Sequence, residues 1–187
     1  MSNVQTLGID EAVRHLCDAE FGSHTLVTYP SMDAWRRIYL GTVKKYLEED
    51  NSLVLVIPFY ETTDSVRQAL AREIPDLDYY IKDGAFAVID SLKAYFSEIG
   101  LMTFADGLLK HALATGRKGL SVFADMGSFN HMQKMHSLLE HEISLPSKYE
   151  ASLRGFCIYN ERNFDAFSQG QKRSVYAHHG NNLLISE

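Results

Sequence analysis

Three acidic residues follow short apolar runs, at positions where an α/β protein commonly binds its ligands. They are Glu61, shortly after Leu53–Ile57; Asp90, directly after Ala85–Ile89; and Asp125, directly after Leu120–Ala124. Ligands of open parallel sheets bind outside the carboxyl ends of the strands, so the three carboxylates would converge if these strands are neighbours. Crowded carboxylates raise one another's pKa or attract a cation. A competing interpretation, open for Asp90 and Asp125, is that they cap the helices that follow.

Hydroxyl groups accompany these acids at the expected strand ends. Tyr29 closes the run His24–Tyr29, Tyr60 precedes Glu61, and Ser91 follows Asp90. These hydroxyls and the three acids are the candidate ligand-binding residues of this edge.

The turn from Tyr29 to Trp35 stands where a nucleotide-binding protein of this layout carries its phosphate loop. Such a loop supplies glycines, whose backbone N–H groups reach the phosphates, and a lysine. The turn contains no glycine, lysine or arginine, Pro30 removes a donor, and Asp33 would repel a phosphate. The sequence therefore predicts that ATP–magnesium is not bound with useful affinity, and no catalytic residue is assigned.

His24 and Cys157 form a second candidate site, because each lies in an expected apolar strand. If the strands are adjacent, a thiol beside an imidazole can have a lowered pKa and contact a ligand. Alternatively, Cys157 is a packed small hydrophobe and the ring of His24 is satisfied by backbone groups. With Glu61 or Asp125 the pair could bind a metal, but the spacing has no zinc signature. We therefore expect no metal ligand and no cofactor.

The hydrophobic pattern predicts the elements that must position these residues. The expected strands are His24–Tyr29, Leu53–Ile57, Ala85–Ile89, Leu120–Ala124, Phe156–Tyr159 and Leu183–Ser186, with Asp78–Ile81 as a further short one. The expected helices are about Asp10–Phe21, Pro30–Glu49, one from near Asp64, Leu101–Leu113 and Ser128–Ile143. Strands separated by helices imply a mostly parallel sheet in a three-layer α/β/α domain. One domain over residues 1–187 is expected, with residues 1–22 as an N-terminal helical extension.

Composition excludes several classes of function. The 187 residues carry a net charge of -6, which argues against nucleic acid as the main partner. The sequence contains no run of about 18 apolar residues, so no membrane span is predicted. The start, residues 1–5, has no signal-peptide pattern, and the two cysteines form no CxxC motif. A cytoplasmic protein with free thiols is the simplest expectation.

Two segments resemble the KaiC-type RecA ATPases. Phe59-Tyr60-Glu61-Thr62-Thr63 is similar to the strand end Phe-x-Glu-Ser/Thr of that family, and Ala87–Leu92 is similar to its Walker B segment. In an active member, the residue at Glu61 would activate water and the residue at Asp90 would hold magnesium through water. The resemblance thus implies a RecA-like fold, while the missing phosphate loop departs from the family pattern.

A resemblance to the MEDS domain, the sensory domain of methanogens and of the methylotroph regulator DcmR, covers about His24 to Ile185. The segments that carry it include a His that opens the first strand and a late Cys-x-Tyr strand. They are His24–Tyr29, Phe156–Asn160, Gly119–Phe129 with the helix that follows, and Tyr176–His179 with Asn182–Ile185. The resemblance implies a RecA-type fold without its phosphate loop, and places His24 and Cys157 at family positions.

These observations favour a non-catalytic signal-transduction domain that binds a small organic ligand or a signalling protein, as in bacterial or archaeal regulators. The alternatives are a divergent nucleotide-binding hydrolase that uses Glu61 and Asp90, and a structural partner of an active RecA-like ATPase. Homo-oligomers are an expectation by analogy of fold only.

Overall fold

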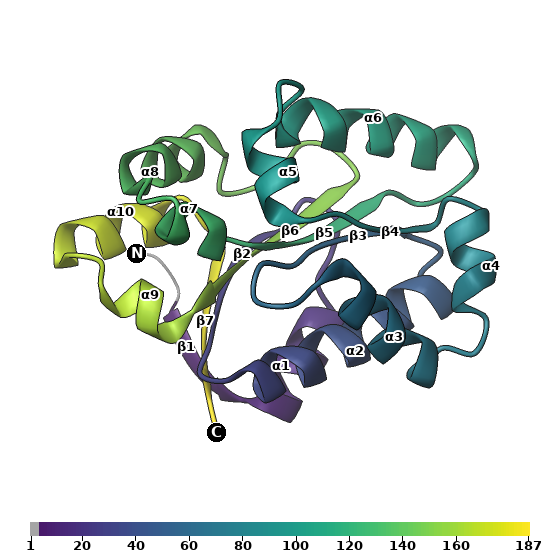
Figure 1. Cartoon of the computed structure of the whole chain (residues 1–187), viewed down its shortest axis with the longest axis horizontal. Coiled ribbons are helices and arrows are strands. Elements are labelled where there is room, and N and C mark those ends of the chain that lie inside the picture. Colours follow the sequence, from purple (N-terminus) through teal and green to yellow (C-terminus); the bar gives the residue numbers. More distant parts are fainter. Residues whose placement is uncertain (1–3) are drawn as a thin grey trace.

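A computed structural model describes residues 4–187, which form seven strands and ten helices (Figure 1). The strands are β1 (Val4–Gly8), β2 (His24–Tyr29), β3 (Leu53–Ile57), β4 (Phe86–Val88), β5 (Leu120–Asp125), β6 (Leu153–Asn160) and β7 (Asn181–Ser186). The helices are α1 (Ile9–Cys17), α2 (Met32–Glu48), α3 (Thr63–Glu73), α4 (Leu77–Lys82), α5 (Ser91–Phe96), α6 (Leu101–Ala114), α7 (Gly127–His131), α8 (Met135–Ser144), α9 (Glu161–Asp165) and α10 (Gln169–Ala177).

The strands form one sheet in the order β1-β7-β2-β6-β5-β3-β4, and every neighbouring pair is parallel. The last strand of the described chain, β7, therefore lies between the first two. Strands β2, β6 and β5 occupy the centre, with Leu26 opposite Cys157 and Cys157 opposite Ala124. The predicted mostly parallel α/β fold is confirmed.

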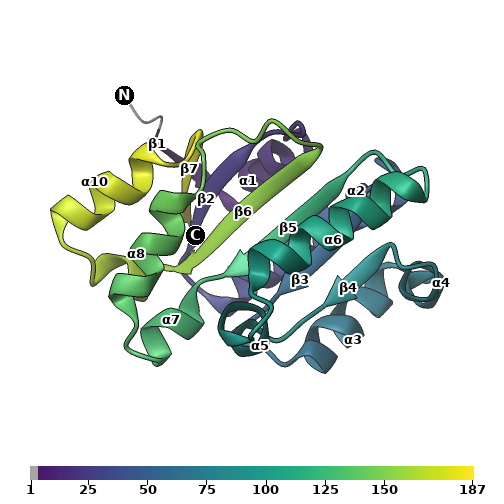
Figure 2. The ribbon, with the colours of Figure 1, turned by 90° about the horizontal axis from the view of Figure 1, so that it is seen from above.

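Helices cover both faces of the sheet, so the domain has three layers (Figures 1 and 2). Alternate residues of β3 show how the faces are divided. Val54 and Val56 pack with α1, α2 and α3 in one core, whereas Leu53, Leu55 and Ile57 pack with α5 and α6 in another. A third core lies under α7, α8 and α10, where Leu138 and Val175 meet β2 and β6. A strand buried on both faces must be apolar throughout, which explains the unbroken run Leu53–Ile57.

Most of the predicted elements are present within a residue or two of their expected ends. Strands β2 and β3 and helices α2 and α6 match their sequence patterns. Gly116, shortly after α6, has a φ of 77°, the left-handed conformation that commonly ends a helix. No helix among residues 4–187 combines the length and the apolar character needed to cross a bilayer.

Three predictions of local structure were wrong. The N-terminal extension is not wholly helical, because Val4–Gly8 form β1 beside β7; residues 1–3 lie outside the described part. Asp78–Ile81 is not a strand but belongs to α4, which begins at Leu77. The helix expected over Ser128–Ile143 is interrupted.

The interruption lies at Gln133, which has a φ of 54°. The N–H of Lys134 donates to the carbonyl of Phe129 at 2.8 Å, which closes α7, and α8 starts at Met135. A left-handed residue cannot continue a right-handed helix, so α7 and α8 are separate helices. The side of α8 that faces the core therefore does not follow from the side of α7 that does. The core-facing side of α8 carries Leu138 and Glu142, both buried.

Candidate functional site

His24 and Cys157 are in contact across the central strands β2 and β6. The Nε2 atom of His24 lies 3.3 Å from Sγ of Cys157, and its Nδ1 atom lies 2.9 Å from the carbonyl oxygen of Pro146. A carbonyl can only accept, so Nδ1 carries the proton and Nε2 offers its lone pair to the thiol. The structure therefore confirms the expected contact between the two residues.

The thiol of Cys157 is not activated by this contact. Burial raises the pKa of Cys157 well above its usual value, and the nearby carboxyl of Glu142 adds to the effect. Burial also lowers the pKa of His24, to about 4. The lowered thiol pKa considered from the sequence is thus wrong for this environment, because a dry interior disfavours both the thiolate and the imidazolium.

Two further residues, Glu142 of α8 and His179, complete this cluster. The Nε2 atom of His179 lies 3.3 Å from Oε2 of Glu142, and Nδ1 of His179 lies 2.8 Å from the carbonyl of Val175. The hydroxyl of Tyr159 donates to Oε1 of Glu142. Burial raises the pKa of Glu142 and lowers that of His179 to about 4.

Sequence reasoning missed both residues, although one signal was present. Glu142 follows Met135, Leu138 and Leu139 at helical spacing, so it occupies the apolar face of its helix. A carboxylate on an inward face needs a buried partner, which makes it a candidate functional group. His179 has no comparable periodic pattern. It lies in Tyr176–His179, one of the segments that carry the family resemblance, but its place depends on how α10 returns to β7.

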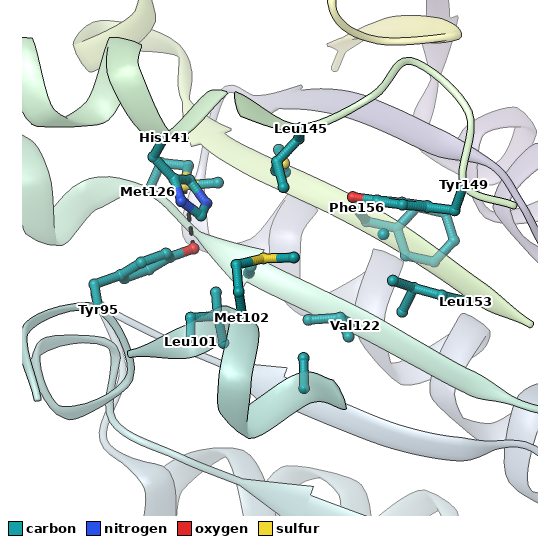
Figure 3. Close-up of a pocket in the computed structure, with 14 residues that line it drawn as sticks. Tyr95, Leu101, Met102, Val122, Met126, His141, Leu145, Tyr149, Leu153 and Phe156 are labelled. Carbon is teal, nitrogen blue, oxygen red and sulfur yellow. Dashed lines mark hydrogen bonds between the residues drawn. The ribbon is translucent and has the colours of Figure 1, made fainter. Parts of the chain in front are cut away.

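A small cavity adjoins Cys157, between α6, α8 and strands β5 and β6 (Figure 3). Its volume is about 40 Å³, which is room for about three water molecules at the ~10–15 Å³ each requires. The polar groups in its wall are Tyr95, His141, Tyr149 and Cys157. The hydroxyl of Tyr95 donates to Sδ of Met126 at 3.1 Å, drawn as a dashed line in Figure 3. The remaining lining is largely aliphatic, including Leu101, Met102, Val122, Leu145 and Leu153.

The candidates at the carboxyl edge of the sheet lie elsewhere. His24 is the first residue of β2 and Tyr29 is the last. The His24 cluster and the carboxyl-edge candidates are therefore separated by about 17 Å at the usual rise of a strand. At this edge the hydroxyl of Tyr29 donates to Asp125 at 3.2 Å, and the N–H of Gly127 donates to Asp125 at 2.8 Å. Burial raises the pKa of Asp125 to about 7.

The other carboxyl-edge candidates have separate partners. Glu61 accepts from Arg36 at 2.8 Å, from the hydroxyl of Tyr39 at 3.2 Å and from Ser65 at 3.1 Å. Asp90 accepts from the N–H groups of residues 92 and 93 and so caps α5, the alternative that the sequence left open. The remaining two hydroxyls differ, because Ser91 is buried whereas Tyr60 is 43% exposed and accepts from Asn163. Parallel pairing brings the three acids to one edge of the sheet, but each accepts hydrogen bonds from a separate set of partners.

A family comparison accounts for most of the chain. No curated protein matches it. A sequence model of the family described as the MEthanogen/methylotroph, DcmR Sensory domain matches residues 23–179. The matched segment runs from the start of β2 to His179, so it contains the whole His24–Glu142–Cys157–His179 cluster and the cavity beside it. The chain therefore belongs to the MEDS family of sensory domains.

Proposed function

We propose that this sensory domain binds a small organic molecule in the cavity beside Cys157, without catalysis. The observation that carries the proposal is the cavity itself, which is mostly apolar and has a few polar groups in its wall. Binding sites for organic ligands commonly combine an apolar lining with a small number of oriented polar groups. Tyr95 and Tyr149 offer hydroxyls and His141 offers an imidazole, whose pKa burial lowers.

The size of the cavity sets the class of ligand. Drug-sized ligands occupy about 300–1,000 Å³, whereas this cavity holds about 40 Å³. The domain would therefore accept a molecule of very few heavy atoms, such as a one- to three-carbon alcohol, ketone or halide, unless the surrounding helices move. Contacts of the ligand with α6 and α8 would bias the packing of these two helices, which gives a route to a signalling partner.

Loss of ATPase activity is the second part of the proposal. The turn before α2 offers no phosphate cradle, and the Ser31 side chain already accepts the N–H of Ala34 at 3.2 Å. Glu61 is bound by Arg36 and Tyr39. These contacts support a degenerate, KaiC-like relative of the RecA fold in which neither Glu61 nor Asp90 serves hydrolysis.

The test compares the wild-type chain with Ala105→Val, which adds two methyl groups at the cavity wall on α6. The matched control is Ala114→Val, the same change at an exposed position of the same helix. Amide spectra are recorded with xenon and with a panel of one- to three-carbon alcohols, ketones and halides. We expect saturable shifts around α6, α8 and β6 in the wild type and in the control, and their loss in Ala105→Val. Absence of saturable shifts in the wild type with every probe would refute the cavity as the site.

A separate measurement addresses catalysis. Titration with ATP–magnesium should give no binding in the micromolar range. Hydrolysis that Glu61→Gln abolishes would establish the nucleotide-binding hydrolase instead.

A further inference from the structure

Four buried side chains from separate parts of the chain meet at one point beneath α8 and α10. His24 comes from β2, Glu142 from α8, Cys157 from β6 and His179 from the segment before β7. One potential ligand atom of each lies within 4.8 Å of the others. All four residues are at most 4% exposed.

Both histidines direct the same ring atom into this cluster. Each donates its Nδ1 proton to a backbone carbonyl, His24 to Pro146 and His179 to Val175. The lone pair of each Nε2 atom therefore faces Cys157 or Glu142. Metal-bound histidines are typically oriented in this way, because a hydrogen bond from the second nitrogen fixes the tautomer and the plane of the ring.

Two atoms of the cluster lack a hydrogen bond among residues 4–187. They are Oε2 of Glu142 and Nε2 of His179, which face each other at 3.3 Å. The other carboxylate oxygen, Oε1, is held by the hydroxyl of Tyr159. Orphaned buried polar atoms are costly, and a cation between them would satisfy both.

We propose that His24, Glu142, Cys157 and His179 bind one divalent transition-metal ion of the zinc class. Two nitrogens, one sulfur and one carboxylate oxygen are the donors that zinc prefers, whereas magnesium and calcium prefer oxygen alone. A thiolate and a carboxylate together neutralise the charge of the ion.

The spacing of the ligand atoms suits a tetrahedral site. Bond lengths of about 2.0–2.3 Å place neighbouring ligands roughly 3.3–3.7 Å apart at the corners of a tetrahedron. The distances from His24 to Cys157 and from His179 to Glu142 are both 3.3 Å. The ligand atoms that lie farthest apart, at up to 4.8 Å, must approach each other by roughly 1 Å, a movement that small changes in side-chain torsions can supply.

Binding exchanges protons for the metal. The ion forms a bond to Sγ of Cys157, the S–H bond breaks, and the proton passes to solvent; a proton held by Glu142 leaves in the same way. No electron is transferred. A competing interpretation needs no metal: the thiol donates to His24, and a protonated Glu142 faces His179.

Cobalt is the spectroscopic probe that separates these interpretations. The full chain is treated with a chelator, freed of it, and titrated with Co²⁺, after which Zn²⁺ is added. We expect saturation at one ion per chain, a thiolate-to-cobalt charge-transfer band, the intense visible bands of a tetrahedral site, release of at least one proton, and displacement by Zn²⁺. A wild-type spectrum without the thiolate band, or no binding, overturns the proposal without reference to any variant.

Variants test two of the four ligands individually. Cys157→Ser and Glu142→Gln should each weaken Co²⁺ binding by at least ~100-fold, since loss of supporting groups alone costs about 10–100-fold. Tyr159→Phe, which leaves all four ligands in place, should weaken binding by about 10-fold. The matched controls are Cys17→Ser and Glu140→Gln, the latter in an exposed pair with His136 at 3.2 Å. Binding that survives Cys157→Ser and is lost in Glu140→Gln would assign the ion to the surface and refute the buried site.

Discussion

Asp125 should make the stability of the domain depend on pH, and Asp125→Asn should remove that dependence. The carboxyl is fully buried at the end of β5, and burial raises its pKa from 3.8 to about 7, against the opposing hydrogen bonds from Gly127 and Tyr29. Between these pH values the folded chain keeps a proton that the unfolded chain has released. The contribution of Asp125 to stability is therefore largest below pH 4 and is lost as pH rises towards 7.

The size of the effect follows from the shift. About three pKa units at 1.36 kcal/mol each give an upper limit of about 4 kcal/mol, with a slope of up to ~1.4 kcal/mol per pH unit. Asparagine is neutral throughout this range, its Oδ1 atom can still accept from Gly127, and its amide can donate to Tyr29. The variant should therefore gain free energy of unfolding relative to the wild type as pH rises.

Urea denaturation of the wild type and the variant at intervals between pH 4.5 and 8 measures this difference directly. Taking the difference removes the contributions of His24, Glu142 and His179, which titrate in both proteins. Asp90→Asn is the control, because Asp90 caps α5 at the surface and asparagine caps equally well. If the free energies of Asp125→Asn and the wild type run parallel across the pH range, the raised pKa of Asp125 is wrong.

Three further predictions concern packing. Arg154 is buried and donates to Ser121, Ala19 and Asp50. Arg154→Ala should therefore lower the free energy of unfolding by about 3 kcal/mol, which is the lower end of the range for breaking a buried ion pair. Lys118→Ala, which removes only an exposed contact to Asp50, should change the free energy of unfolding by less than ~1 kcal/mol in the same urea titration. A Cβ atom at Gly119 would lie 2.1 Å from the carbonyl oxygen of Ser152, whereas one at Gly107 meets nothing within 4 Å. Gly119→Ala should therefore fail to fold, as measured by circular dichroism. Gly107→Ala should raise the free energy of unfolding by about 0.5–1 kcal/mol. Cys17 is partly exposed and Cys157 is 4% exposed, so an aromatic disulfide reagent should modify one thiol per native chain and two in urea; two rapid modifications in the native state would contradict the burial of Cys157.

The sequence predicted the centre of the sheet well, because strands buried on both faces leave an unbroken apolar signature. It failed where burial is partial. β1 has one buried residue, Leu7, and Val4–Gly8 carries too weak a pattern to distinguish an edge strand from a helix. Asp78–Ile81 contains β-favouring aromatic residues, yet only Leu77 of α4 is buried, so local propensity was outweighed by its place in the fold.

The candidate site was foreseen in part. His24 and Cys157 were singled out from family positions, and their contact needed only that β2 and β6 be adjacent. Glu142 and His179 depended on the break at Gln133 and on the return of α10, neither of which has a periodic signature. A four-residue site assembled from positions 24, 142, 157 and 179 has no spacing rule that a single sequence can reveal.

The position of β7 between β1 and β2 bears on how the chain can fold as it is synthesised. Residues 4–8 pair along their length with β7 alone, and β7 leaves the ribosome after the other six described strands. Until Asn181–Ser186 has been synthesised, β1 therefore has no partner strand, and the edge of β2 that pairs with β7 stays open. Contacts across about 180 residues close late, a separation that slows folding in proteins of this size. Interruption of translation before Asn181 would leave a nascent chain in which β1 has no partner and β2 pairs with β6 alone. Unpaired strand edges of this kind are prone to aggregation.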